Sequence, residues 1–273
     1  MTKYNDSLRG YAFNSDIGRT MEGSWVDRYY ESLEFFYWEP QHLGKRKVVG
    51  SRIDSLGVAQ KHWRNMEVTL NHIMKYFFSL SPASVICRTL SEGLGREIGK
   101  DYTISSLRFD KVLTKSCQPD FLFLANSGVC SLEMKLDSKT SINQVLKYAL
   151  MGLAVEQQVG KELSHGLVFL GKGKFEEIWP KSSGVICPDS LRSELASKAE
   201  AFSDKHLKSR DNRTRYLLIV AGLDIGFLNY KDFASILSTE REAAHDCATG
   251  EMYGGLIDGL MGELKARKLI PES

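Results

Sequence analysis

The sequence predicts an α/β protein in which one mixed β-sheet is flanked by helices. Segments with the three- and four-residue apolar spacing of amphipathic helices alternate along the chain with short apolar runs typical of strands. The turn signal Asn126-Ser127-Gly128 separates two such runs and predicts a β-hairpin. The chain has no internal repeat and no low-complexity tract, so long disordered linkers are not expected.

The composition is that of an ordinary globular protein. The 273 residues are 42% hydrophobic and 26% charged, and 36 Lys and Arg nearly balance 34 Asp and Glu. The net charge of +2 excludes a highly basic protein that coats nucleic acid and an acidic solvating tail. A local basic groove remains compatible with this charge, because the total says nothing about its distribution.

The sequence also predicts where the protein resides. The five cysteines are scattered and form no Cys-x-x-Cys pair, so neither a disulfide framework nor a structural zinc site is expected. The first residues lack the apolar segment of a secretory signal, and 18 consecutive apolar residues occur nowhere. We therefore expect a cytoplasmic protein in a reducing environment, without membrane contact.

An aromatic-rich segment, Trp25 to Trp38, lies near the N-terminus and ends before Glu39-Pro40. We interpret it as a helix or strand that packs on the core. The alternative is base stacking by exposed aromatic residues, which requires basic residues around them. The chain is thus divided into an N-terminal extension, residues 1–60, and a main domain, residues 61–273.

Two helices are expected at the start of the main domain. Apolar spacing predicts the first from about Asn65, as its N-cap, to Leu80, and the second over residues 83–94. The glycines within residues 93–100 match neither a dinucleotide fingerprint nor a Walker loop, so this segment is predicted to be a loop. A strand is expected within residues 101–109.

The predicted hairpin comprises residues 121–124 and 129–136. In its second strand, Ser131, Glu133 and Lys135 lie on one face, and the alternating apolar residues lie on the other. A helix with a clear apolar face begins at Ile142.

The remaining elements are read from similar patterns. Strands are expected at His165–Leu170 and at Arg215–Leu223, the most clearly apolar run in the chain. Helices are expected over residues 190–207, 230–244 and 251–269.

The hairpin brings together side chains that can bind a metal ion and take part in catalysis. Asp120 precedes its first strand, and Glu133 and Lys135 share one face of the second. Two carboxylates on adjacent strands form an oxygen-rich site suited to Mg²⁺ or Mn²⁺. The lysine can orient a water molecule or stabilise charge on a phosphodiester under attack. The alternative interpretation is an exposed strand face that carries an ordinary Glu and Lys.

Pro119-Asp120 followed by Glu133-Met134-Lys135 resembles the motif of the PD-(D/E)XK nuclease superfamily. The order of the elements is similar too: helix, strand, hairpin with the motif, helix and strand. Many members carry Gln-x-x-x-Tyr on the helix after the motif, and Gln144 and Tyr148 match that pair. The resemblance covers about residues 65–170 and extends at most to the run at 216–220.

The resemblance implies a restriction-endonuclease-like fold and a metal-dependent nuclease, with DNA as the expected substrate. Residues 61–273 would form the nuclease-like domain. Asp120, Glu133 and the Met134 carbonyl would bind Mg²⁺ or Mn²⁺, and Lys135 would position the attacking water. Gln144 and Tyr148 would support the site or contact the nucleic acid backbone.

The family often adds an acidic residue from the first core helix as a further metal ligand. Glu67 is the best match here, ahead of Glu92 and Glu97. A homodimer or a larger protein assembly is also common among relatives. The alternative function is a non-catalytic nuclease-fold module that binds or assembles within a DNA defence, transposition or repair complex.

A basic run between the later elements is the candidate surface for nucleic acid phosphates. Most runs of this kind are solvated loops, which is the competing interpretation. The run comprises Lys205, Lys208, Arg210, Arg213 and Arg215.

Overall fold

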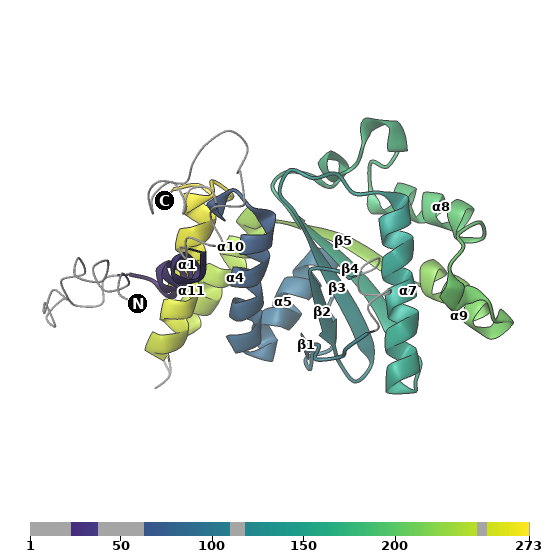
Figure 1. Cartoon of the computed structure of the whole chain (residues 1–273), viewed down its shortest axis with the longest axis horizontal. Helices are drawn as coiled ribbons and strands as arrows, with labels where there is room; N and C mark the ends of the chain where they lie inside the picture. Colours follow the sequence, from purple (N-terminus) through teal and green to yellow (C-terminus); the bar gives the residue numbers. More distant parts are fainter. Residues whose placement is uncertain (1–22, 38–62, 110–117, 245–249, 273) are drawn as a thin grey trace, which may run out of the picture.

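A computed structural model of the chain describes residues 23–37, 63–109, 118–244 and 250–272. These residues form a five-stranded mixed sheet flanked by helices (Figure 1). The strands follow the sequence in order: β1 Thr103–Ile104, β2 Phe121–Leu124, β3 Gly128–Lys135, β4 Ser164–Gly171 and β5 Asp224–Asn229. The predicted α/β class is confirmed.

The pairing of the strands determines which loops meet. β1, β2 and β3 are antiparallel neighbours, whereas β3, β4 and β5 are parallel. The carboxyl ends of these three parallel strands therefore lie along one edge of the sheet. Lys135, Gly171 and Asn229 are in register there. We refer to this side of the sheet as the carboxyl edge.

Helices cover both faces of the sheet (Figure 1). One face carries α4, α5 and α10, with α1 and α11 outside them; the other carries α7, with α8 and α9 beyond it. Short 3₁₀ turns lie between β4 and α9. The bounds are α1 Trp25–Tyr37, α4 Glu67–Leu80, α5 Ala83–Leu94, α7 Ile142–Val159, η1 Phe175–Ile178, η2 Lys181–Ser183, α8 Pro188–Ala199, η3 Lys205–Leu207, α9 Arg210–Ala221, α10 Tyr230–Ala243 and α11 Gly250–Ala266.

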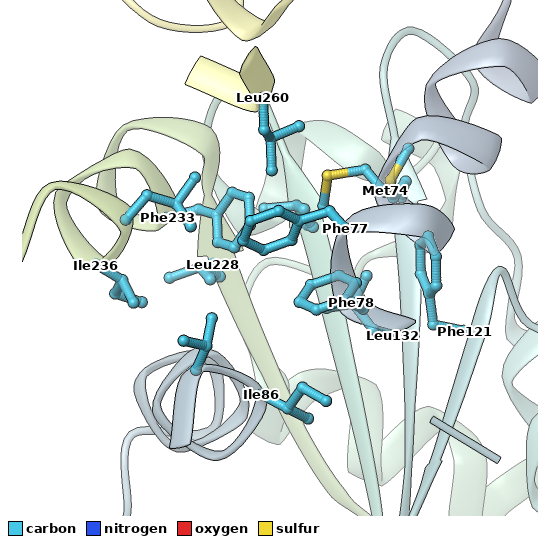
Figure 2. Packing of buried hydrophobic residues seen from close by; sticks show 14 of the residues in the cluster. Met74, Phe77, Phe78, Ile86, Phe121, Leu132, Leu228, Phe233, Ile236 and Leu260 are labelled. Atoms are coloured by element: carbon cyan, nitrogen blue, oxygen red, sulfur yellow. The ribbon is translucent and has the colours of Figure 1, made fainter. Parts of the chain in front are cut away.

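The larger hydrophobic core lies between the sheet and α4, α5, α10 and α11. Figure 2 shows Phe78 of α4 at its centre, beside Phe121 and Leu132 of the sheet. The Phe78 ring meets Phe121 and Phe123 edge-on, with centroids 5.4 and 5.2 Å apart. Such contacts favour one orientation of α4 over the sheet, and this orientation carries the start of α4 to the carboxyl edge.

The aromatic segment near the N-terminus forms α1, which packs against α11 (Figure 1). Val26 and Tyr30 are buried in the larger core, and Trp25 donates its indole N–H to the Leu256 carbonyl at 2.9 Å. The packing interpretation is therefore confirmed for this part of the segment. Trp38 and Glu39-Pro40 lie outside the described residues.

The prediction of a strand at Arg215–Leu223 is wrong. Residues 210–221 form α9, and the strand that follows is β5. Ser209 caps the helix by accepting the Asn212 N–H, and the helix buries Tyr216, Ile219 and Val220, whose spacing is helical. A short apolar run fits a buried strand and a helix equally well, and the polar first turn with its cap distinguishes them.

Several boundaries also differ from prediction. The helix expected over residues 190–207 ends at Ala199, and a separate turn, η3, follows. The strand expected within 101–109 has only two residues, and α4 begins at Glu67 with Met66, not Asn65, at its N-cap. Within the described residues, no helix combines the length and apolar character needed to cross a bilayer.

Candidate functional site

The β2–β3 hairpin brings Asp120 and Glu133 together. Phe121 pairs with Leu132, and continuing this register places Asp120 opposite Glu133 on the same face of the sheet. The Asp120 backbone N–H donates to Glu133 Oε2 at 3.3 Å. The predicted hairpin is thus confirmed, and it brings the two carboxylates side by side.

The polar face of β3 is buried. Ser131, Glu133 and Lys135 are each only 6% exposed, so the interpretation as an exposed strand face is wrong. Charged side chains are rarely buried to this extent without a partner. Lys135 Nζ donates to Glu133 Oε1 at 2.8 Å, so the two charges neutralise one another inside the protein.

Helix α7 provides a further hydrogen bond to the Glu133 side chain. Ser141 accepts the Gln144 N–H and fixes the start of the helix. From the first turn, Gln144 Nε2 donates to Glu133 Oε1 at 2.9 Å and to the Tyr148 hydroxyl. Thr140 in turn donates to Gln144 Oε1 at 2.9 Å. The predicted Gln144–Tyr148 pair therefore lies on one face of α7, in contact with Glu133.

Helix α4 contributes two further residues. The Glu67 carboxylate interacts with Lys135 and with the Ser138 hydroxyl, so its predicted place beside the site agrees with the structure. Asn71, one turn later, donates from Nδ2 to Asp120 Oδ1 at 2.5 Å. No sequence motif includes Asn71, although its i+4 spacing from Glu67 places both residues on one helix face.

Backbone atoms at the end of β3 also face Asp120. The Met134 N–H donates to Asp120 Oδ2 at 2.7 Å. The N–H and C=O groups of a strand residue point to the same side of the strand. The Met134 carbonyl is therefore directed, like its N–H, toward the side of β3 that faces Asp120. β2 begins only at Phe121, and the β2–β3 ladder therefore does not reach Met134.

Three carboxylates and one lysine leave an excess of negative charge. Burial, followed by the nearby Glu133 charge, raises the pKa of Asp120 from 3.8 to about 7. Burial is also the main cause that raises the pKa of Glu67, and Lys135 opposes it. Burial and the Glu133 charge raise the pKa of Tyr148. A cation bound here would relieve the repulsion among the carboxylates.

The donor set fits a hard divalent cation. Asp120 and Glu133 supply carboxylate oxygens, the Met134 carbonyl faces the same side, and Glu67 approaches from α4. Within the described ranges, no three His, Cys, Asp or Glu side chains form a metal-binding group by themselves. Mg²⁺ suits this arrangement, because it binds few protein carboxylates and keeps several of its water molecules.

The pKa of Asp120 predicts how the stability of the metal-free protein depends on pH. The unfolded chain releases this proton near pH 3.8, whereas the folded protein retains it until about pH 7. The folded state therefore binds more protons between these values, and the Asp120 contribution to stability falls as pH rises. We expect Asp120→Asn to flatten this fall in thermal melts recorded with EDTA from about pH 4 to pH 8. Equal slopes for both proteins would contradict the prediction.

The other predicted residues lie elsewhere. Glu92 and Glu97 are near the opposite edge of the sheet, beside the Arg96–Asp224 ion pair at the start of β5. The basic run lies on η3 and α9, beyond α7 (Figure 1). Lys205, Lys208 and Arg210 are exposed.

The two arginines at the end of the basic run make internal contacts. Arg213 donates to the carbonyls of Ala199, Glu200 and Phe202. Arg215 forms ion pairs with Glu156 at 2.6 Å and Glu162 at 2.9 Å. Their hydrogen bonds connect α9 to its neighbours, so a role in phosphate binding remains only a prediction.

No family model, curated protein or solved structure matches the chain. Function must therefore be inferred from the residues gathered at the carboxyl edge of the sheet.

Proposed function

We propose that the protein is a metal-dependent nuclease that hydrolyses phosphodiester bonds in DNA. The observation that carries the proposal is the pairing of Asp120 with Glu133 across the hairpin, with Lys135 bonded to Glu133 in a buried site. A mixed sheet with this hairpin, followed by the Gln144–Tyr148 helix, also supports a restriction-endonuclease-like fold as a proposal. The resemblance to the PD-(D/E)XK superfamily rests on the same residues.

In this proposal Asp120, Glu133, the Met134 carbonyl and Glu67 would hold Mg²⁺ or Mn²⁺. The cation supplies charge neutralisation at the phosphate and lowers the pKa of a bound water. Lys135, whose ammonium group is kept beside Glu133 by a hydrogen bond, orients the attacking water and stabilises the negative charge on the phosphate oxygens.

Gln144 and Tyr148 act through Glu133 in this account. Gln144 donates one hydrogen bond to the Glu133 carboxylate and one to Tyr148, and Thr140 fixes its orientation. Held in this way, Glu133 loses little conformational freedom when a cation binds. Such partners typically change metal affinity about 10- to 100-fold when they are removed.

One observation favours a different function. Glu133 and Lys135 already form a buried ion pair at 2.8 Å, and a pair of this kind can serve structure alone. The protein would then be a non-catalytic module that keeps the fold and binds or assembles within a DNA-processing complex. A partner would supply the DNA affinity that a net charge of +2 leaves modest.

A metal titration separates the two functions. We expect Mn²⁺ to raise the melting temperature of the wild-type protein, because a ligand that binds only the folded state stabilises it. Glu133→Gln should lose this rise while it keeps the shape of the side chain. The wild type should also cleave duplex, nicked or single-stranded DNA with Mg²⁺ and not with EDTA. Absence of both the rise and the cleavage would support the binding module.

A further inference from the structure

Helix α10 delivers a tyrosine to the carboxyl edge of the sheet. β5 ends at Asn229, which is in register with Gly171 of β4, and Gly171 is in register with Lys135 of β3. Tyr230 follows immediately as the first residue of α10, whose N-terminus Asn229 caps. Its side chain is fully buried, in the core that also contains α4. Tyr230 thus lies at the same end of the sheet as the proposed cation site.

The Tyr230 hydroxyl has no hydrogen-bond partner among the described residues. A buried tyrosine hydroxyl usually has one, because an unsatisfied buried polar group destabilises the folded state. Packing alone does not explain the hydroxyl, since phenylalanine would fill the same space without this cost. Burial is the main cause that raises the pKa of Tyr230, and the charges of Glu67 and Asp120 raise it further. The hydroxyl is therefore within electrostatic reach of both carboxylates.

Asn71 provides a second buried atom without a partner beside the same carboxylates. Its amide nitrogen donates to Asp120 Oδ1, whereas its Oδ1 is buried and unpaired within the described part of the chain. An amide oxygen accepts hydrogen bonds, and a tyrosine hydroxyl both donates and accepts them. A water bound to a cation can donate to either group, and Mg²⁺ keeps several such waters.

We propose that Asn71 and Tyr230 are positioning residues that complete the cation site from α4 and α10. They hold Asp120 and water molecules of a partly hydrated divalent cation. This inference rests on the proposed function, because it requires a cation between Asp120 and Glu133. The inference adds to the proposed function by assigning to the site the neutral side chains of Asn71 and Tyr230. Both lie on helices outside the sequence motif.

Tyr230→Phe tests the proposal, because it removes only the hydroxyl. Without metal, we expect an unchanged or higher melting temperature, since a buried group without a partner is lost. With Mn²⁺, we expect a smaller rise than in the wild type and an affinity about 10- to 100-fold weaker by calorimetry. Rise and affinity are both measured without any activity assay.

Tyr216→Phe is the matched control. Tyr216 is also fully buried, but it lies on the other face of the sheet and donates to the Leu146 carbonyl at 3.3 Å. Its loss should lower the metal-free melting temperature and leave the Mn²⁺-dependent rise intact. The two Tyr→Phe variants should therefore differ in both measurements.

Asn71→Leu gives a second variant of similar side-chain size, and it should also weaken Mn²⁺ binding. If Mn²⁺ raises the melting temperature of the wild type, but Tyr230→Phe and Asn71→Leu bind Mn²⁺ as tightly, the positioning role is refuted and the proposed function stands. If the wild type itself shows no Mn²⁺ binding, both proposals fail.

Discussion

Lys135→Ala is expected to reduce Mg²⁺-dependent DNA cleavage by about 100- to 10,000-fold. This is the range for loss of a group that assists proton transfer or stabilises charge during the reaction. Lys135 is the only cation that hydrogen bonds Glu133 among the described residues, and its side chain is 7% exposed. Bulk water therefore cannot readily replace its charge. The measurement is the single-turnover rate of plasmid nicking at saturating Mg²⁺.

The prediction is specific because Lys135→Ala should reduce cleavage without reducing metal binding. Lys135→Ala removes a positive charge beside the carboxylates, so its Mn²⁺-dependent rise in melting temperature should persist or grow. Asp120→Ala removes a proposed ligand and should lose the rise and the cleavage together. Cleavage by either variant at the wild-type rate would rule out these residues as the catalytic site.

Glu263→Ala is expected to lower the free energy of unfolding by about 3–5 kcal/mol, the usual cost of leaving a buried charge without its partner. The Glu263 side chain is fully buried. It accepts hydrogen bonds from Arg267 at 2.6 Å, from Arg64 at 3.2 Å and from the Tyr30 hydroxyl. The carboxylate thus connects α1, α11 and the segment before α4.

This cluster also borders the proposed site. Arg267 donates to the Met66 carbonyl at 3.1 Å, and Met66 directly precedes Glu67. Loss of Glu263 should therefore weaken Mn²⁺ binding as well as stability. Urea denaturation of metal-free protein measures the first effect, and a Mn²⁺ titration of the folded fraction measures the second.

Glu162→Ala is the control for an exposed ion pair. Glu162 pairs with Arg215 at 2.9 Å, but its side chain is 79% exposed, and such pairs contribute about 0–1 kcal/mol. A Glu263→Ala variant that is no less stable than Glu162→Ala would show that the buried cluster does not hold the terminal helices.

Much of the hairpin could be predicted from the sequence. Alternation along β3 and the turn at Asn126-Ser127-Gly128 determine the register, and the register determines that Asp120 lies opposite Glu133. The resemblance to the Gln-x-x-x-Tyr pair points to Gln144 and Tyr148, and their i+4 spacing predicts that both lie on one face of α7. These inferences depend on contacts between residues close in sequence, for which periodicity is a direct signal.

The remainder depends on contacts between distant segments. Lys135 is buried because α7 and β4 cover β3. The sequence of β3 alone does not reveal this burial. Tyr230 reaches the carboxyl edge only because the strand is β5 and the preceding apolar run is α9. The apolar run predicts a strand that ends at Leu223, six residues before β5 ends at Asn229. The sequence pattern therefore does not place Tyr230 at the carboxyl edge.

The central claim is that a divalent cation binds between Asp120 and Glu133. Diffraction from a crystal soaked in Mn²⁺, measured where manganese scatters anomalously, tests it most directly. We predict an anomalous peak within coordination distance of both carboxylates, at about 2.0–2.5 Å from their oxygens, and its loss in Glu133→Gln. Soaked crystals without a peak at this position, and with the Lys135–Glu133 hydrogen bond unchanged, would contradict it.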